Sequence, residues 1–146
     1  DYPDILNGDT KSARLRLFYA LDSSKYLIFK TGYEYEKTKD RTYTNDRISF
    51  ALGFGAELPY GFHVYAEPSV LFTNYKGERW TVKDYKFEEI KERDVMQRYS
   101  VSISNRNLSF WGMVPTLTYS YTDKSSNIWQ REYEKSLIEF SIQKSF

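Results

Sequence analysis

Apolar and polar residues alternate along most of the chain. The clearest stretch covers residues 133–146, where Ile138, Phe140 and Ile142 alternate with polar side chains. A period of two is typical of a β-strand. The same alternation recurs in 14–21, 27–36, 48–58, 62–73, 98–104 and 111–122. The pattern predicts seven strands, most of them about ten residues or longer, and no helix of useful length.

The connections between these strands alternate in length. Short turns are expected at 22–25, 59–61 and 105–109, and long polar loops at 37–45, 76–95 and 123–135. Outer-membrane barrels have short periplasmic turns and longer external loops. We therefore predict a charged, solvated external loop at 76–94 that could bind a partner. A short helix within 81–97 and a continuation of the strands are the alternatives.

The character of the polar face bears on whether the apolar face contacts lipid or a dry core. A β-sandwich or a lipocalin-like barrel would show the same period. Here the polar face carries mainly Ser, Thr, Gly and Ala, which suit a barrel lumen, and ten-residue tilted strands can span a bilayer. The predicted fold class is all-β, with antiparallel transmembrane β-barrel strands in the outer membrane of a Gram-negative bacterium.

Composition narrows the possible classes of protein and kinds of site further. Of the 146 residues 40% are apolar and 18% aromatic, and the mean hydropathy is −0.67, so a large dry core is not expected. The net charge of +1 supplies no basic field for nucleic acid. The chain has no Cys and one His, which excludes disulfides, thiolate metal sites and histidine clusters. It opens Asp1-Tyr2-Pro3-Asp4 without a signal segment, as a mature or excised piece would.

Strand parity predicts that the barrel is incomplete. If Phe146 ends at the periplasm, all short connections lie on that side and the first strand descends from outside. Bacterial single-chain barrels have even strand numbers and no open edges. We therefore expect residues 1–146 to form the C-terminal part of an outer-membrane β-barrel domain, half of a barrel of about fourteen strands. Its expected partners are outer-membrane lipid and the missing N-terminal half of the barrel.

Charged residues on the polar face are the candidate lumen-lining residues. They are Arg14, Arg16, Lys30, Glu34, Arg47, Glu57, Glu67, Arg98, Arg106 and Glu139. They would form cross-strand ion pairs that fill a polar lumen. In an alternative interpretation, some of them contact a passing polypeptide.

Two single residues stand out. His63 lies on the polar face with Glu67 and Ser69, a set that suggests a hydrolase, but the spacing puts His63 and Ser69 about 20 Å apart on one strand. A serine on a neighbouring strand could substitute. Pro115 inside a strand removes a backbone donor and predicts a kink or bulge. No catalytic residue, metal motif or cofactor site is expected.

Several segments resemble the C-terminal barrel of the surface lipoprotein assembly modifier family (Slam proteins). They are Arg93-Asp94, Ser104 to Gly112, Pro115 to Tyr121, Ser126-Asn127-Ile128, the turn Glu57 to Phe62 and the terminal strand ending in Phe146. The resemblance implies a periplasmic helical-repeat domain followed by a barrel. It further implies that the barrel helps to move lipoproteins or soluble binding proteins to the cell surface.

We therefore expect a component of an outer-membrane translocon without enzymatic activity. Its partner would be a secreted or lipid-anchored client protein. The alternatives from other classes are a passive porin or structural barrel and an outer-membrane hydrolase.

Overall fold

The computed structural model describes residues 8–144, which form seven antiparallel strands joined by short connections. The strands are β1 (Gly8–Ala20), β2 (Lys25–Thr38), β3 (Asn45–Glu57), β4 (Phe62–Lys83), β5 (Lys86–Asn105), β6 (Met113–Ser126) and β7 (Tyr133–Lys144). Three 3₁₀ turns are η2 (Pro59–Gly61), η3 (Arg106–Leu108) and η4 (Trp129–Arg131). The all-β, antiparallel fold is confirmed. The opening Asp1 to Asp4 and the final Phe146, used in the sequence argument, lie outside the described residues.

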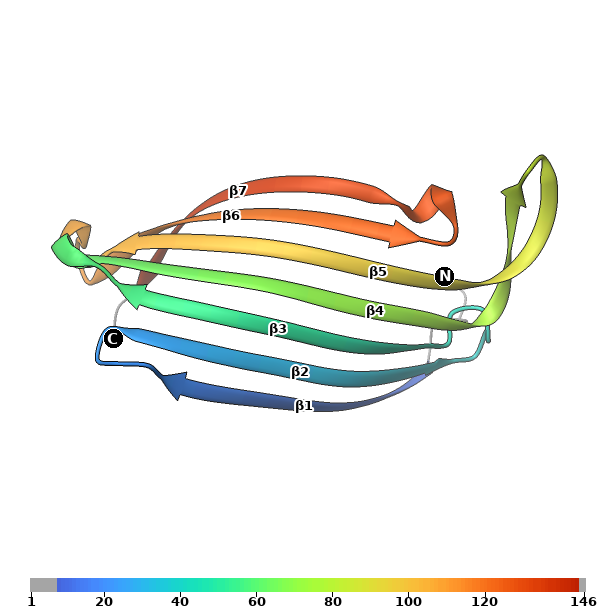
Figure 1. Ribbon diagram of the computed structural model, residues 1–146, viewed down its shortest axis with the longest axis horizontal. Helices are drawn as coiled ribbons and strands as arrows, with labels where there is room; N and C mark the ends of the chain where they lie inside the picture. The colour runs from blue at the N-terminus through green and yellow to red at the C-terminus, as the bar shows by residue number, and fades with distance from the viewer. Residues whose placement is uncertain (1–7, 145–146) are drawn as a thin grey trace.

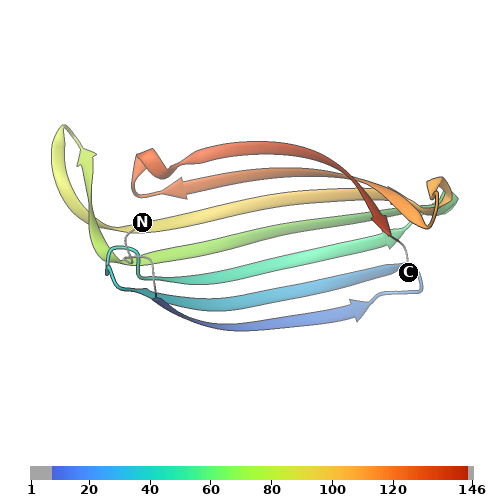
Figure 2. The same ribbon diagram turned by 180° about the vertical axis from the view of Figure 1, so that it is seen from behind.

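The strands form one sheet in which each strand pairs with its neighbours in sequence, in the order β1-β2-β3-β4-β5-β6-β7. Figures 1 and 2 show a single curved layer, with no second layer stacked on it. The sheet is open, because β1 and β7 each pair on one side only. A two-layer sandwich, one of the alternatives considered from the sequence, is therefore wrong.

The pairing register keeps most of the apolar members of every strand on one face. Phe29 lies opposite Leu52, and Leu117 lies opposite Phe140. These side chains are exposed, with Phe140 at 67%. Among the described residues only Ile28, Ala56 and Ile128 are buried apolar residues, so the sheet has no dry core. We call this side the apolar face and the opposite side the polar face.

The connections lie at two ends of the sheet, as the sequence predicts. Those joining β1 to β2, β3 to β4 and β5 to β6 gather at one end, and the other three gather at the opposite end (Figure 1). Side chains stabilise the turns at both ends. The Ser24 N–H and hydroxyl donate to the Asp22 carboxylate and lower the pKa of Asp22. The Thr42 N–H likewise donates to Asp40 and lowers the pKa of Asp40.

The region 76–95 is a long β-hairpin, so the prediction of a solvated loop and the alternative of a helix are both wrong. β4 runs 22 residues and β5 runs 20, and only Asp84 and Tyr85 connect them, both with positive φ. This two-residue geometry matches the right-handed twist of the flanking strands. The hairpin projects beyond the other strands (Figure 1). Its apolar side chains Trp80, Val82 and Phe87 are exposed among charged neighbours, a composition that a two-stranded ribbon exposed on both faces tolerates.

The irregularity in the sheet also differs from the one predicted. Pro115 pairs with Ile142 in an unbroken register, so the expected kink or bulge at Pro115 is wrong. Pairing of β5 with β6 ends at Thr116, so the missing N–H of Pro115 removes no bond to β5. The register instead shifts between Asn74 and Glu78, where β4 carries extra residues at the base of the projecting hairpin.

Gly53 on the polar face of β3 lies beneath the ring of Tyr65 from β4. A Cβ at Gly53 would overlap the Tyr65 ring, whereas a Cβ at Gly32 would meet Ser49 Oγ at 3.0 Å. Overpacking a tight contact costs roughly 1–3 kcal/mol. We expect Gly53→Ala to lower the urea midpoint of the refolded parent protein and the control Gly32→Ala to change it much less. Equal midpoints would contradict the Tyr65 contact.

Candidate functional site

The polar face carries the charged residues predicted to line a lumen. The register places nine of the ten on this one face: Arg14, Arg16, Lys30, Glu34, Arg47, Glu57, Glu67, Arg98 and Glu139. The tenth, Arg106, lies in η3 and forms an ion pair with Glu57. Whether these residues line a closed lumen stays a prediction.

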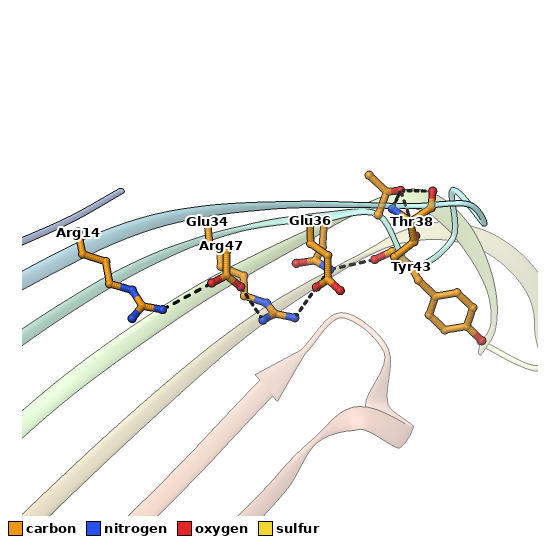
Figure 3. Close-up of polar contacts among 8 residues, drawn as sticks. Arg14, Glu34, Glu36, Thr38, Tyr43 and Arg47 are labelled. Carbon is orange, nitrogen blue, oxygen red and sulfur yellow. Dashed lines mark hydrogen bonds and ion pairs between the residues drawn. The ribbon is translucent and has the colours of Figure 1, made fainter. Parts of the chain in front are cut away.

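A ladder of alternating charge crosses β1, β2 and β3 on the polar face. Arg47 Nη1 lies 3.1 Å from Glu34 Oε1 and Arg47 Nη2 lies 3.3 Å from Glu36 Oε2, while Arg14 Nη2 lies 3.8 Å from Glu34 Oε2. Figure 3 shows the three strands contributing side chains to the same side of the sheet. This ladder joins neighbouring strands as the predicted cross-strand ion pairs would.

A second polar group lies nearer the short-turn end. Lys30 Nζ donates to Glu67 Oε2 at 2.6 Å, and the Tyr65 hydroxyl donates to the same oxygen. Nearby, the Tyr26 hydroxyl and His63 Nε2 are 3.1 Å apart, and the two rings stack. The polar face therefore has a band of mutually bonded side chains between β2 and β4.

This arrangement does not assemble the hydrolase set considered from the sequence. Among the described residues, the hydrogen bond of the His63 ring goes to Tyr26, and Glu67 bonds to Lys30 and Tyr65. The Ser69 hydroxyl donates to the Arg98 carbonyl oxygen. The three residues thus contact different partners and form no relay from acid to base to nucleophile.

A buried ionic cluster lies where the projecting hairpin leaves the sheet. Arg79 Nη1 contacts Glu92 Oε2 at 2.7 Å, and Lys124 Nζ contacts Asp94 Oδ2 at 3.0 Å. Arg131 Nε approaches Glu92 Oε1 at 3.8 Å. We call these five residues the hairpin-base cluster. Burial of the Glu92 carboxyl, which is 1% exposed, raises the pKa of Glu92, and the neighbouring Asp94 raises it further.

Aromatic rings and loops close around this cluster. The Arg79 guanidinium lies 4.6 Å from the Tyr75 ring centre and 5.3 Å from that of Tyr43, which belongs to the β2–β3 connection. Asn127, in the β6–β7 connection, accepts from the Arg93 N–H and donates to the Lys91 carbonyl. The cluster therefore fastens all three connections at this end of the sheet to one another.

Sequence reasoning missed the hairpin-base cluster because it placed Glu92 and Asp94 in a solvated loop. The available signal was the alternation of Trp80 and Val82 with polar neighbours. That alternation continues the strands and brings Arg79 and Glu92 close together across the hairpin.

Residues 8–144 lack two further features. They contain no set of three or more His, Cys, Asp or Glu side chains placed to hold a metal ion. In the same range, no helix has the length and apolar character needed to cross a membrane.

The fold and its two faces define a class of protein: a single curved β-meander with one exposed apolar face and one face lined by ion pairs. The sequence matches the family described as Surface lipoprotein assembly modifier over residues 2–146. The chain belongs to this family, and the resemblance noted from the sequence is confirmed.

Curated relatives agree with the family match. The chain is 30% identical over 141 residues to Surface lipoprotein assembly modifier 1 of Haemophilus influenzae, covering 97% of this chain and 28% of that protein. It is 24% identical over 143 residues to Surface lipoprotein assembly modifier of Pasteurella multocida, covering 96% and 28%. The chain thus spans about 28% of the length of these relatives. No solved structure matches the chain.

Proposed function

We propose that the chain forms part of an outer-membrane β-barrel that helps to place lipoproteins on the surface of a Gram-negative cell. The observation that carries this proposal is an apolar face exposed along every strand of a protein that belongs to the surface lipoprotein assembly modifier family. The relatives are named for surface lipoprotein assembly. The partner we infer for the parent protein is accordingly a secreted or lipid-anchored client.

The dimensions of the strands support a membrane-spanning role. β7 has 12 residues, which at about 3.3 Å per residue extend about 40 Å. Tilted by about 45°, such a strand crosses about 28 Å, close to the apolar band of outer-membrane barrels. Water would leave the apolar face unfavourably solvated, whereas lipid would cover it.

The open edges support completion by further strands. In hydrocarbon, unpaired backbone groups along β1 and β7 would each cost several kcal/mol, by the general value for such groups. We infer that the remainder of the barrel supplies strands for both edges. The isolated 146-residue chain is expected to aggregate or to pair with another copy.

We further propose that the protein has no enzymatic activity, no resident cofactor and no nucleic-acid partner. The engagement of His63 by Tyr26, and of Glu67 by Lys30 and Tyr65, supports this view. The polar face is occupied by ion pairs that join strands, which suits a structural or transport role.

Deletion of the parent gene tests the proposed function. We expect the client lipoprotein to be made at normal levels but to become inaccessible to protease and antibody on intact cells. A plasmid carrying the complete gene should restore exposure, while one encoding only the 146 residues should not. If exposure of every candidate client is unchanged, the export function fails and a passive porin becomes the better interpretation.

Single cysteines test the orientation of the sheet, because this chain contributes no Cys of its own. In a parent protein free of other accessible cysteines, we expect Lys39→Cys, Lys86→Cys and Ser125→Cys to react with a membrane-impermeant thiol reagent on intact cells. Ser23→Cys and Asn107→Cys, at the short-turn end, should react only after the outer membrane is opened. The reversed pattern would overturn the orientation.

A further inference from the structure

The charges on the polar face are not evenly distributed among the rows that run across the sheet. Each row consists of one residue from each strand, aligned by successive cross-strand pairs. One such row on the polar face contains Arg16, Lys30, Ala51, Ser69, Arg98, Thr122 and Lys135. It contains four basic residues and no acidic one, and we call it the basic row.

The next row toward the hairpin end is also positively charged. It contains Arg14 and Lys124 but no carboxylate. Acidic partners lie in flanking rows: Glu67 beside Lys30, Glu34 beside Arg14, and Asp94 beside Lys124. Positive charge is therefore concentrated in two adjacent rows across the middle of the polar face.

Three members of the basic row have no ion-pair partner among the residues that the structure describes. Within residues 8–144, no ion pair joins Arg16, Arg98 or Lys135 to a carboxylate, whereas Arg47 is paired with two glutamates. Arg16 also lies directly opposite the like-charged Lys30. Like charges in this cross-strand position destabilise a sheet. A bound anion would relieve that repulsion.

The row also has room for a ligand. Between Lys30 and Arg98 it carries only the short side chains of Ala51 and Ser69. A hollow of about 460 Å³ lies there, and Arg14, Arg16, Lys30, Ser69 and Arg98 contribute to its walls. A smaller hollow of about 200 Å³ continues the row, between Arg98 and Lys135.

From this geometry we infer that the basic row is an anion-binding site that takes carboxylate or similar anionic groups. Lys30 and Arg98 are three strands apart, about 14 Å at the usual strand spacing. A carboxylate in the hollow would accept hydrogen bonds from one cation and feel the field of the others. The site requires only that the polar face be reachable from water, and does not depend on the identity of the client.

Charged thiol reagents test the site in the parent protein folded in detergent or lipid. Ser69→Cys reports from the middle of the basic row, and Thr118→Cys reports from the same face beside Glu139. The measured quantity is the reaction rate with an anionic methanethiosulfonate divided by the rate with a cationic one. We expect this ratio to be about tenfold higher for Ser69→Cys than for Thr118→Cys at low salt, and to fall as salt is raised.

Charge removal supplies the second measurement. In the Ser69→Cys background, Arg16→Gln with Arg98→Gln should bring the rate ratio close to that of Thr118→Cys. A ratio for Ser69→Cys that equals the control, or that does not respond to the two substitutions, overturns the proposal. A Ser69→Cys protein that reacts with neither reagent overturns it as well, because an anion could not reach the row.

A peptide competition identifies the source of the anionic group. If a glutamate-rich peptide slows the reaction of the Ser69→Cys protein with a neutral reagent and a glutamine-rich peptide of equal length does not, the site takes polypeptide carboxylates. If neither peptide protects the thiol but the preference for the anionic reagent persists, the site takes free small anions. Failure of the deletion experiment would leave these rate ratios unaffected, so the two proposals fail independently.

Discussion

Phe140→Arg is expected to block assembly of the proposed outer-membrane barrel, while Ser141→Arg is expected to be tolerated. Phe140 lies on the apolar face, 67% exposed, and its neighbour Ser141 lies on the polar face opposite Thr116. An arginine facing lipid at mid-membrane costs roughly 2–4 kcal/mol, whereas one facing a polar interior costs less. The pair tests both the membrane-facing side and the register of β7.

The measurement for this pair is the amount of heat-modifiable, folded protein in the outer-membrane fraction. Both variants add the same charge to the same strand at adjacent positions, so differences in synthesis or targeting affect them equally. Folded protein should be depleted in Phe140→Arg alone. Equal depletion in both variants would count against the assignment of faces.

Arg79→Gln is expected to loosen the projecting hairpin. The Arg79 side chain is 12% exposed, contacts Glu92 and lies against Tyr43 and Tyr75. Removing one member of a buried ion pair leaves the other charge uncompensated, which costs about 3 kcal/mol at the lower end of the usual range. Hydrogen exchange in segment 76–95 should therefore accelerate about a hundredfold in the folded parent protein.

Two further variants define the cause of this effect. Arg131→Gln removes the longer, half-exposed contact to Glu92 and should change exchange by less than about tenfold. Combining Arg79→Gln with Glu92→Gln removes the stranded carboxylate and should recover part of the protection. If the double variant exchanges as fast as Arg79→Gln, the uncompensated charge of Glu92 is not the reason for the loosening.

Outside the projecting hairpin, the alternation of side chains was sufficient to predict the seven strands and their faces. Ile138, Phe140 and Ile142 share a face because strand geometry fixes the orientation of every second residue, whatever the partner strand. The polar face of Arg14, Lys30 and Arg98 follows from the same rule. This part of the structure depends on local periodicity alone.

Features that depend on register could not be predicted from the sequence. The ion pair of Lys30 with Glu67 joins β2 and β4 across β3, so it depends on two successive alignments. The basic row depends on six successive strand alignments. The hairpin beyond Asn74 differs from the prediction for another reason: dense charges are typical of a loop, but an exposed ribbon bears charge on both faces as well.

The strict pairing of each strand with its sequence neighbours has a consequence for how the width of the sheet can change. Excising or duplicating one hairpin, two strands with their connection, would remove or add a self-contained block and leave most other pairings unchanged. The block also preserves the up-and-down direction of the strands that follow. The width of such a meander can therefore change in steps of two strands.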